Sequence, residues 1–139
     1  MKRFILSVTF LFLLPCATIF AEIVTASTLH TAVRSGKKCT LGKKIKIILD
    51  ENLMLSTLKK VCTKKNRLAQ LILYSSQKKE FIIPKKMAAR LRQILKVDAP
   101  IIVSGNAQLV IEEGATVVFN NNDIIITDNA ALIFKATVL

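Results

Sequence analysis

Two cysteines and one histidine are the side chains whose types most readily support chemistry. Cys39 and Cys62 lack Cys-x-x-Cys spacing, and His30 is the only histidine, so a metal site would lack ligands. A catalytic cysteine would lack a base for the same reason. In an oxidising compartment an isolated pair usually bonds, and closing a loop of about 24 residues stabilises by roughly 3 kcal/mol in the chain-entropy model. We therefore predict a disulfide between Cys39 and Cys62, and we assign His30 no role.

The other polar residues do not form a recognisable catalytic set. The sequence has no paired acids at one site, no Ser/His/Asp set and no phosphate-binding loop. We therefore expect a protein that is not an enzyme and that needs neither a metal nor a cofactor.

Lysine doublets are the most frequent motif. Between Glu22 and Lys96 there are 18 Lys or Arg residues against four acids, which would attract an acidic glycan, lipopolysaccharide or anionic membrane. Nucleic acid is not an expected partner, because Tyr74 and Phe81 are the only aromatic residues there and provide no stacking platform. The alternative is a solvated basic surface without a ligand. The candidate contacts to an anionic ligand are Lys37, Lys38, Lys43, Lys44, Lys59, Lys60, Lys64, Lys65, Lys85, Lys86, Arg90 and Arg92.

The first 21 residues have the layout of a secretory signal peptide. Lys2 and Arg3 precede an apolar run over residues 4–14, and Ala21 occupies the cleavage position. Because the apolar run is short for a bilayer span, we expect cleavage and export to the periplasm, cell surface or exterior. Cleavage after Ala26 and lipid attachment at Cys16 are the alternatives.

Charge divides the remaining chain. In contrast to the basic part, residues 97–139 contain Lys135 as the only basic residue and five acids. The change falls near Asp98. Together with the signal-peptide layout at 1–21, this change predicts a small basic α+β module at 22–97 and a β-rich repeat at 98–139.

The basic part predicts mixed structure. Residues 46–55 fit either an outlying rung of the repeat described below or a helix that Asp50 caps, with Leu55, Leu58 and Cys62 near one face, and periodicity does not decide between them. Residues 71–74 and 81–83 predict two strands joined by a loop. Pro84 predicts the start of an amphipathic helix over 85–97, which either packs on the protein's own sheet or lies on an anionic membrane.

Three similar apolar runs follow polar corners near the C-terminus. The corners are residues 104–106, 112–114 and 127–129, and each ends in Gly or Asn, which tolerate left-handed backbone angles. Residues 109–119 align with 124–134 without a gap, which predicts a period of 15, with half-units spaced by eight and then 15. Alternation predicts that the inward-facing residues are Ala107, Leu109, Ile111, Ala115, Val117, Phe119, Ile124, Ile126, Ala130, Leu132 and Phe134.

The opposite face of these runs is unusually apolar. Its residues are aliphatic where a half-exposed sheet would place polar groups, so we expect that the 87–95 helix or another chain covers it. These residues are Ile102, Val110, Val118, Ile125 and Ile133.

The run over residues 105–122 resembles the rungs of right-handed parallel β-helices in secreted adhesins and autotransporter passengers. Residues 119–122, Phe-Asn-Asn-Asn, also match the F-x-x-N tetrapeptide of chlamydial polymorphic outer-membrane proteins. The resemblance implies a β-solenoid and a role in surface adhesion or scaffolding.

We therefore expect a mainly β protein with minor α structure, in which a short β-solenoid packs on the basic module. Too few rungs are present to stand alone, so we expect the repeat to dock on that module, to pair with another subunit through an open strand edge, or to be part of a longer chain. The leading functional prediction is an exported, non-enzymatic binding or structural protein. The alternative is a periplasmic protein that binds an anionic ligand.

Overall fold

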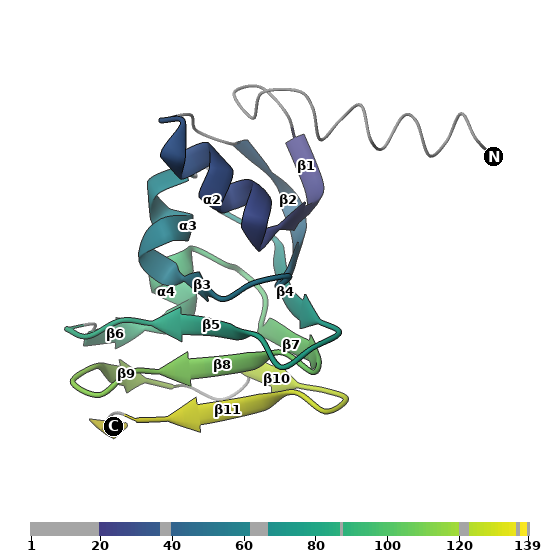
Figure 1. The fold of residues 1–139 in the computed structure, drawn as a ribbon. Coiled ribbons are helices and arrows are strands. Elements are labelled where there is room, and N and C mark those ends of the chain that lie inside the picture. Colours follow the sequence, from purple (N-terminus) through teal and green to yellow (C-terminus); the bar gives the residue numbers. More distant parts are fainter. Residues whose placement is uncertain are drawn as a thin grey trace.

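Strands dominate the fold, and short helices interrupt them (Figure 1). The computed structural model describes residues 20–36, 40–61, 67–86, 88–119, 123–135 and 137–138. All paired strands in this part of the chain are parallel to each other. The expectation of a mainly β protein with minor α structure is confirmed, and its sheets are parallel.

The strands belong to three sheets. The first has the order β1-β2-β4-β7-β10, the second β11-β8-β5-β3 and the third β12-β9-β6. The strands are β1 Phe20–Thr25, β2 Thr40–Ile48, β3 Leu53–Met54, β4 Gln70–Ser75, β5 Glu80–Ile83, β6 Ala88–Arg90, β7 Ile101–Gly105, β8 Gln108–Ile111, β9 Thr116–Val118, β10 Ile124–Ile126, β11 Ala131–Phe134 and β12 Thr137–Val138. The helices are α2 Ala26–Arg34, α3 Leu55–Val61 and α4 Leu91–Leu95.

The chain visits the three sheets in the same order each time. We call one such visit a pass: β4-β5-β6 is followed by β7-β8-β9 and then by the last pass, β10-β11-β12. Strands β2 and β3 begin an earlier pass, in which α3 follows β3. Successive passes therefore lie side by side in every sheet (Figure 1).

The stacking period differs from the predicted one. In the last pass, Ile124 pairs with Ile101 and Ala131 pairs with Gln108, so stacked partners in the first two sheets are 23 residues apart there. The predicted alignment at a period of 15 is wrong, because it superimposes runs that belong to different sheets. The two predicted spacings, eight and 15, together make one full pass.

One hydrophobic core lies between the sheets. In the first sheet, Leu73 is aligned with Ile47 on one side and Val103 on the other, and all three are buried. In the second sheet, Phe81 is aligned with Leu53 and Leu109 in the same way. The core includes residues on both sides of Asp98, and β4 pairs with β7 across that position. The change in charge is therefore not a boundary between sheets, and the division into separate modules stays a prediction.

The predicted inward residues differ in burial between the last two passes. Ala107, Leu109, Ile111, Ala115 and Val117 belong to the pass β7-β8-β9 or its corners, and all five are buried. In the last pass alternation still places the predicted residues on the core side, but they are less covered. Ile126 is 39% exposed and Phe134 is 45% exposed, although both are aligned with buried residues of the preceding pass.

The corners between the first and second sheets are stacked as well. Gly105 has a φ of 65°, and an added Cβ would lie 2.3 Å from the carbonyl oxygen of Ser75 in the preceding pass. Asp128 has the corresponding left-handed conformation in the last pass, where the prediction favoured Asn129. A carboxylate oxygen of Asp128 accepts a hydrogen bond from the Gly105 amide at 3.0 Å, which ties the two corners together.

The predicted helix over 85–97 is wrong in its first half. Residues 88–90 form β6, which pairs with β9, and only residues 91–95 are helical. Lys86 has a φ of 67°, and its amide donates to the carbonyl of Gly114, so Pro84 precedes a corner and not a helix start. The ladder to β9 stabilises the extended backbone, which local periodicity cannot reveal.

Residues 46–55 combine parts of both predicted alternatives. Residues 46–48 belong to β2 and Leu53 to β3, as the strand interpretation requires. A helix does follow, but it begins at Leu55, and Asp50 does not cap it. The Asp50 carboxylate instead accepts hydrogen bonds from the amide and hydroxyl of Ser27 at the start of α2. Residues 71–74 and 81–83 are strands as predicted, but they lie in different sheets.

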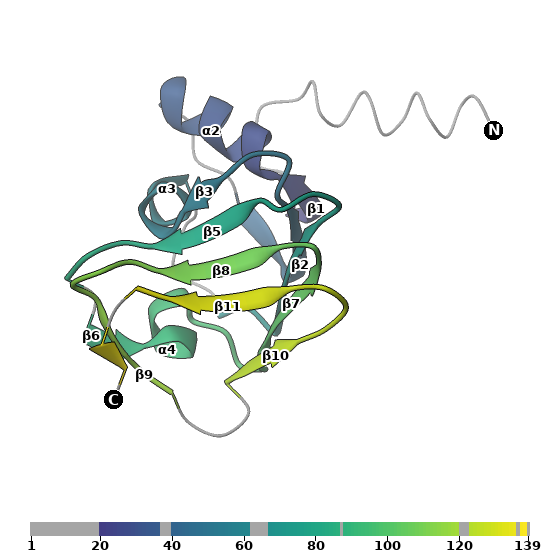
Figure 2. The same cartoon turned by 60° about the horizontal axis from the view of Figure 1, so that its bottom comes forward.

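Helix α2 lies at the end of the stack opposite the last pass (Figures 1 and 2). Thr25 caps its N-terminus by accepting a hydrogen bond from the Thr28 amide at 3.1 Å. Its inner face buries Ala26, Leu29 and Ala32, which belong to the common core. The first strands of the stack are therefore adjacent to a helix, whereas no element of the described structure pairs with the outer edge of the last pass.

Candidate functional site

The predicted anionic-ligand contacts lie on several separate elements. Lys43 and Lys44 are in β2, whereas Lys59 and Lys60 are in α3. A third group lies near the third sheet, where Lys85 and Lys86 form a turn, Arg90 ends β6 and Arg92 belongs to α4. Lys37, Lys38, Lys64 and Lys65 lie outside the described residues.

The outer face of the first sheet combines lysines with aliphatic side chains. One row across the five strands consists of Ile23, Lys46, Ile72, Ile102 and Ile125, which are aligned partners in successive strands. Because Ile45 and Ile47 face the core, Lys46 faces outward by strand alternation. The structure thus places four isoleucines in one row with a cation on a parallel sheet.

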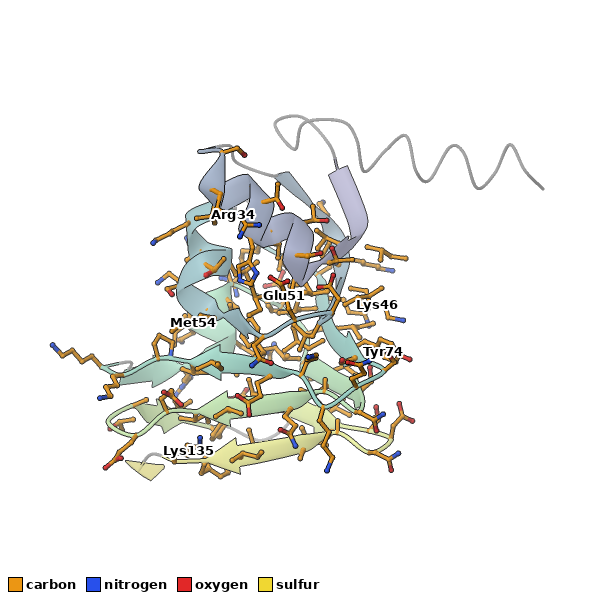
Figure 3. All side chains as sticks on the ribbon, in the orientation of Figure 1. Arg34, Lys46, Glu51, Met54, Tyr74 and Lys135 are labelled. Carbon is orange, nitrogen blue, oxygen red and sulfur yellow. The ribbon has the colours of Figure 1, made fainter. Side chains whose placement is uncertain are left out.

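Tyr74 interacts with Lys46 on this face. The Lys46 ammonium lies 4.5 Å from the centre of the Tyr74 ring, which is a cation–π geometry (Figure 3). Lys44 is exposed two residues earlier in β2. None of the outward side chains that the structure describes in this sheet is acidic. Lys46, Tyr74 and Lys44 therefore form the candidate binding surface.

The contact of Lys46 with Tyr74 has no signal in the sequence. Lys46 is not part of a lysine doublet, and Tyr74 is 28 residues away. Their proximity depends on the register that aligns Lys46 with Ile72 and Ile48 with Tyr74. Alternation in both strands indicates that each side chain faces outward, but it does not indicate which strands are neighbours.

One row across the outer face of the second sheet is apolar. Met54, Ile82, Val110 and Ile133 are aligned across its four strands. Val110 is only 1% exposed, and Ile82 and Ile133 flank it in the register. Helix α4 contributes Leu91 to the core, so the expectation that a helix over 87–95 covers this face from outside is wrong.

The ionic contacts connect structural elements. Arg92 lies 3.6 Å from the buried Asp123 carboxylate and links α4 to the start of the last pass. His30, which was assigned no role from its sequence context, contacts Glu51 and links α2 to the corner before β3. Within the described residues, no group of three or more His, Cys, Asp or Glu side chains could hold a metal ion.

The predicted disulfide lies outside the described residues. Cys39 precedes β2 and Cys62 follows α3, and neither has a described position. The pairing of Cys39 with Cys62 therefore stays a prediction. Among the helices in the described part of the chain, none has the length and apolar character needed to cross a membrane.

Comparisons with protein-family models, curated proteins and solved structures found no match to this chain.

Proposed function

We propose that this chain is an exported, non-enzymatic binding or structural protein whose three parallel sheets are the faces of a short β-solenoid. The observation that carries the proposal is the repeated order of the sheets, with stacked partners aligned in the first and second sheets. Such stacking presents flat, extended faces, which repeat scaffolds use for binding. The residues that resemble β-helix rungs, 105–122, begin in the corner that joins β7 to β8 and include β8 and β9.

Engineered cysteines provide the test of the stacked coils. We expect Ile72→Cys with Ile102→Cys in the first sheet, and Gln108→Cys with Ala131→Cys in the second, to form intramolecular disulfides on mild oxidation, because these residues are aligned partners in adjacent strands. The matched control joins Ile72→Cys to Ser104→Cys, which is two residues out of register. Peptide mapping that found equal crosslinking in the control, or none in either aligned pair, would contradict the proposed coils.

Export rests on the signal-peptide layout. Cleavage after Ala21 removes Phe20 and Ala21, the first two residues of β1, and keeps residues 23–25, which pair with residues 46–48 of β2. Cleavage after Ala26 would remove this part of the first sheet and the Thr25 cap of α2. We expect mass spectrometry of protein from the native host to find an N-terminus at Glu22, and an intact Met1 in the cytoplasm would refute export.

An anionic ligand is the second candidate function, and the outer face of the first sheet favours it. Lys46 lies there against the Tyr74 ring, and Lys44 lies two residues earlier in β2, without an acidic residue among the described outward side chains. Acidic glycans and anionic lipids would both complement this charge. Binding should weaken as salt rises, because the Debye length falls to about 10 Å at 0.1 M ionic strength.

Heparin chromatography of the whole chain tests this candidate. We expect the double variant Lys44→Gln, Lys46→Gln to elute at lower salt than the matched variant Lys59→Gln, Lys60→Gln, which removes the same charge from α3. Equal elution of the two variants would mean that retention depends on net charge and not on this face. The whole chain is required because β2, β4 and β7 belong to one sheet.

A further inference from the structure

The last pass leaves apolar core positions open to solvent. Strands β10, β11 and β12 each pair on one side only within the described structure. Phe134 stacks edge-to-face on Phe119, with ring centres 5.9 Å apart, yet nearly half of its surface stays exposed. Leu132 and Ile124 are also incompletely covered, although they are aligned with the buried Leu109 and Ile101.

The outer edge of β11 also has free backbone groups. The amides of Ala131 and Lys135 donate to the carbonyls of Ala107 and Ile111 in the preceding pass. Because backbone groups alternate along a strand, the N–H and C=O groups of Leu132 and Phe134 point toward the open side. This edge can therefore accept another strand.

These edge strands are short, but β10 and β11 lack three other features that usually protect a sheet edge: charge, proline and a bulge. Strands β10 and β11 contain no charged residue and no proline, and their pairing with β7 and β8 shows no bulge. Exposed apolar edges of this kind pair with other chains. The last pass is therefore an interaction surface, which consists of the edges of β10, β11 and β12 and the side chains of Ile126, Leu132 and Phe134.

The geometry points to a second copy of this chain as the occupant, joined end to end by a two-fold axis that pairs β11 with the partner's β11 in antiparallel orientation. This inference rests on the proposed stack of coils. Asp128 precedes β11 and Lys135 follows it, so antiparallel pairing places each carboxylate near the partner's ammonium group. The opposite end of the stack has α2 packed on its core, whereas in the last pass the core-facing Ile126 and Phe134 are 39% and 45% exposed.

The association is tested by light scattering and analytical ultracentrifugation of the purified protein over a range of concentrations. We expect a monomer–dimer equilibrium that does not proceed to larger species, because a two-fold interface closes on itself. Phe134→Lys should raise the dissociation constant by about a hundredfold or more, since it places a charge in the apolar contact on both sides. The matched control, Ile23→Lys, changes an isoleucine that is 55% exposed at the other end and should leave the equilibrium unchanged.

A charge variant tests the antiparallel arrangement independently of folding. Lys135 is exposed, so Lys135→Asp should keep the wild-type circular dichroism. It places acids at both ends of β11, and we expect the dissociation constant to rise about tenfold. This variant decides the question if Phe134→Lys does not fold. An unchanged constant, or growth into open-ended assemblies, would overturn the two-fold arrangement.

Different results would contradict the dimer and the proposed solenoid. A monomer at every concentration, together with successful crosslinks at both aligned cysteine pairs, would overturn the dimer and leave the stacked coils in place. The absence of both crosslinks would overturn the coils themselves.

Discussion

The two ends of the stack contain the same kind of apolar, core-facing residue, but they differ in what covers it. At the N-terminal end, Leu29 of α2 is completely buried. Two sets of hydrogen bonds stabilise the start of this helix: the Thr25 cap and the bonds from Ser27 to Asp50. At the other end, Phe134 remains half exposed. The difference teaches that alternation sets the direction of a side chain, whereas neighbouring passes determine its burial.

The largest expected effect is the difference in lost stability between a buried charge in the pass β7-β8-β9 and the same charge in the last pass. Val117 is fully buried, so Val117→Asp should reduce the free energy of unfolding by several kcal/mol, on the order expected for an unpaired buried charge. Ile126→Asp should cost only about 1 kcal/mol, because part of this position is solvated. Urea denaturation below the association concentration measures both.

Thr116→Asp is the control for the direction of the Val117 side chain. Thr116 is adjacent to Val117 and faces outward, so the cost should be well under about 1 kcal/mol. Equal damage from Val117→Asp and Thr116→Asp would contradict the alternation in β9.

Truncation to alanine should give a smaller contrast between the two ends. Leu29→Ala should cost about 3 kcal/mol, since it leaves a cavity between α2 and the sheets. Phe134→Ala should cost about 1 kcal/mol in the monomer, because little of the lost contact is enclosed. If thermal unfolding of the monomers gave equal losses, the open end would be covered in solution by part of the same chain.

The corner glycines test how closely successive passes approach each other. Gly105→Ala should cost more than about 2 kcal/mol, because its methyl group would collide with the Ser75 carbonyl and because φ is positive. Gly114→Ala has the same backbone penalty, but its nearest neighbour is the flexible Lys85 side chain at 3.6 Å. It should cost about 1 kcal/mol. Denaturant midpoints that rank the two variants in reverse would contradict the stacked corner at Gly105.

The smallest expected effect concerns the helix cap. Thr25→Ala removes the acceptor for the Thr28 amide and should cost about 1 kcal/mol. Faster hydrogen exchange should be confined to α2. Thr31→Ala removes the same hydroxyl from an exposed position in the same helix and should change stability by less than about 0.5 kcal/mol. Loss of protection throughout the stack in Thr25→Ala would mean that α2 and the sheets unfold as one unit.

Much of the local structure could be predicted from the sequence. Alternation identified Leu109, Ile111 and Val117 as core residues, because in a strand successive side chains point to opposite faces. The corner at Gly105 was predicted because glycine tolerates a left-handed backbone. The corner at Lys86 was missed because lysine gives no such signal. The same limit applies to Ala88–Arg90, whose strand depends on a distant partner.

The sequence by itself determined the extended segments at 71–74, 81–83, 108–111 and 116–118, the corners at Gly105 and Gly114, and the inward direction of Leu109, Ile111 and Val117. Only the tertiary structure decided the 23-residue spacing between stacked partners, the contact of Lys46 with Tyr74 and the exposure of Phe134. The physical reason is the separation along the chain of the residues that interact. Turning and alternation depend on the backbone of a few consecutive residues, whereas register, cross-strand contacts and burial depend on hydrogen bonds and packing between segments far apart in the chain.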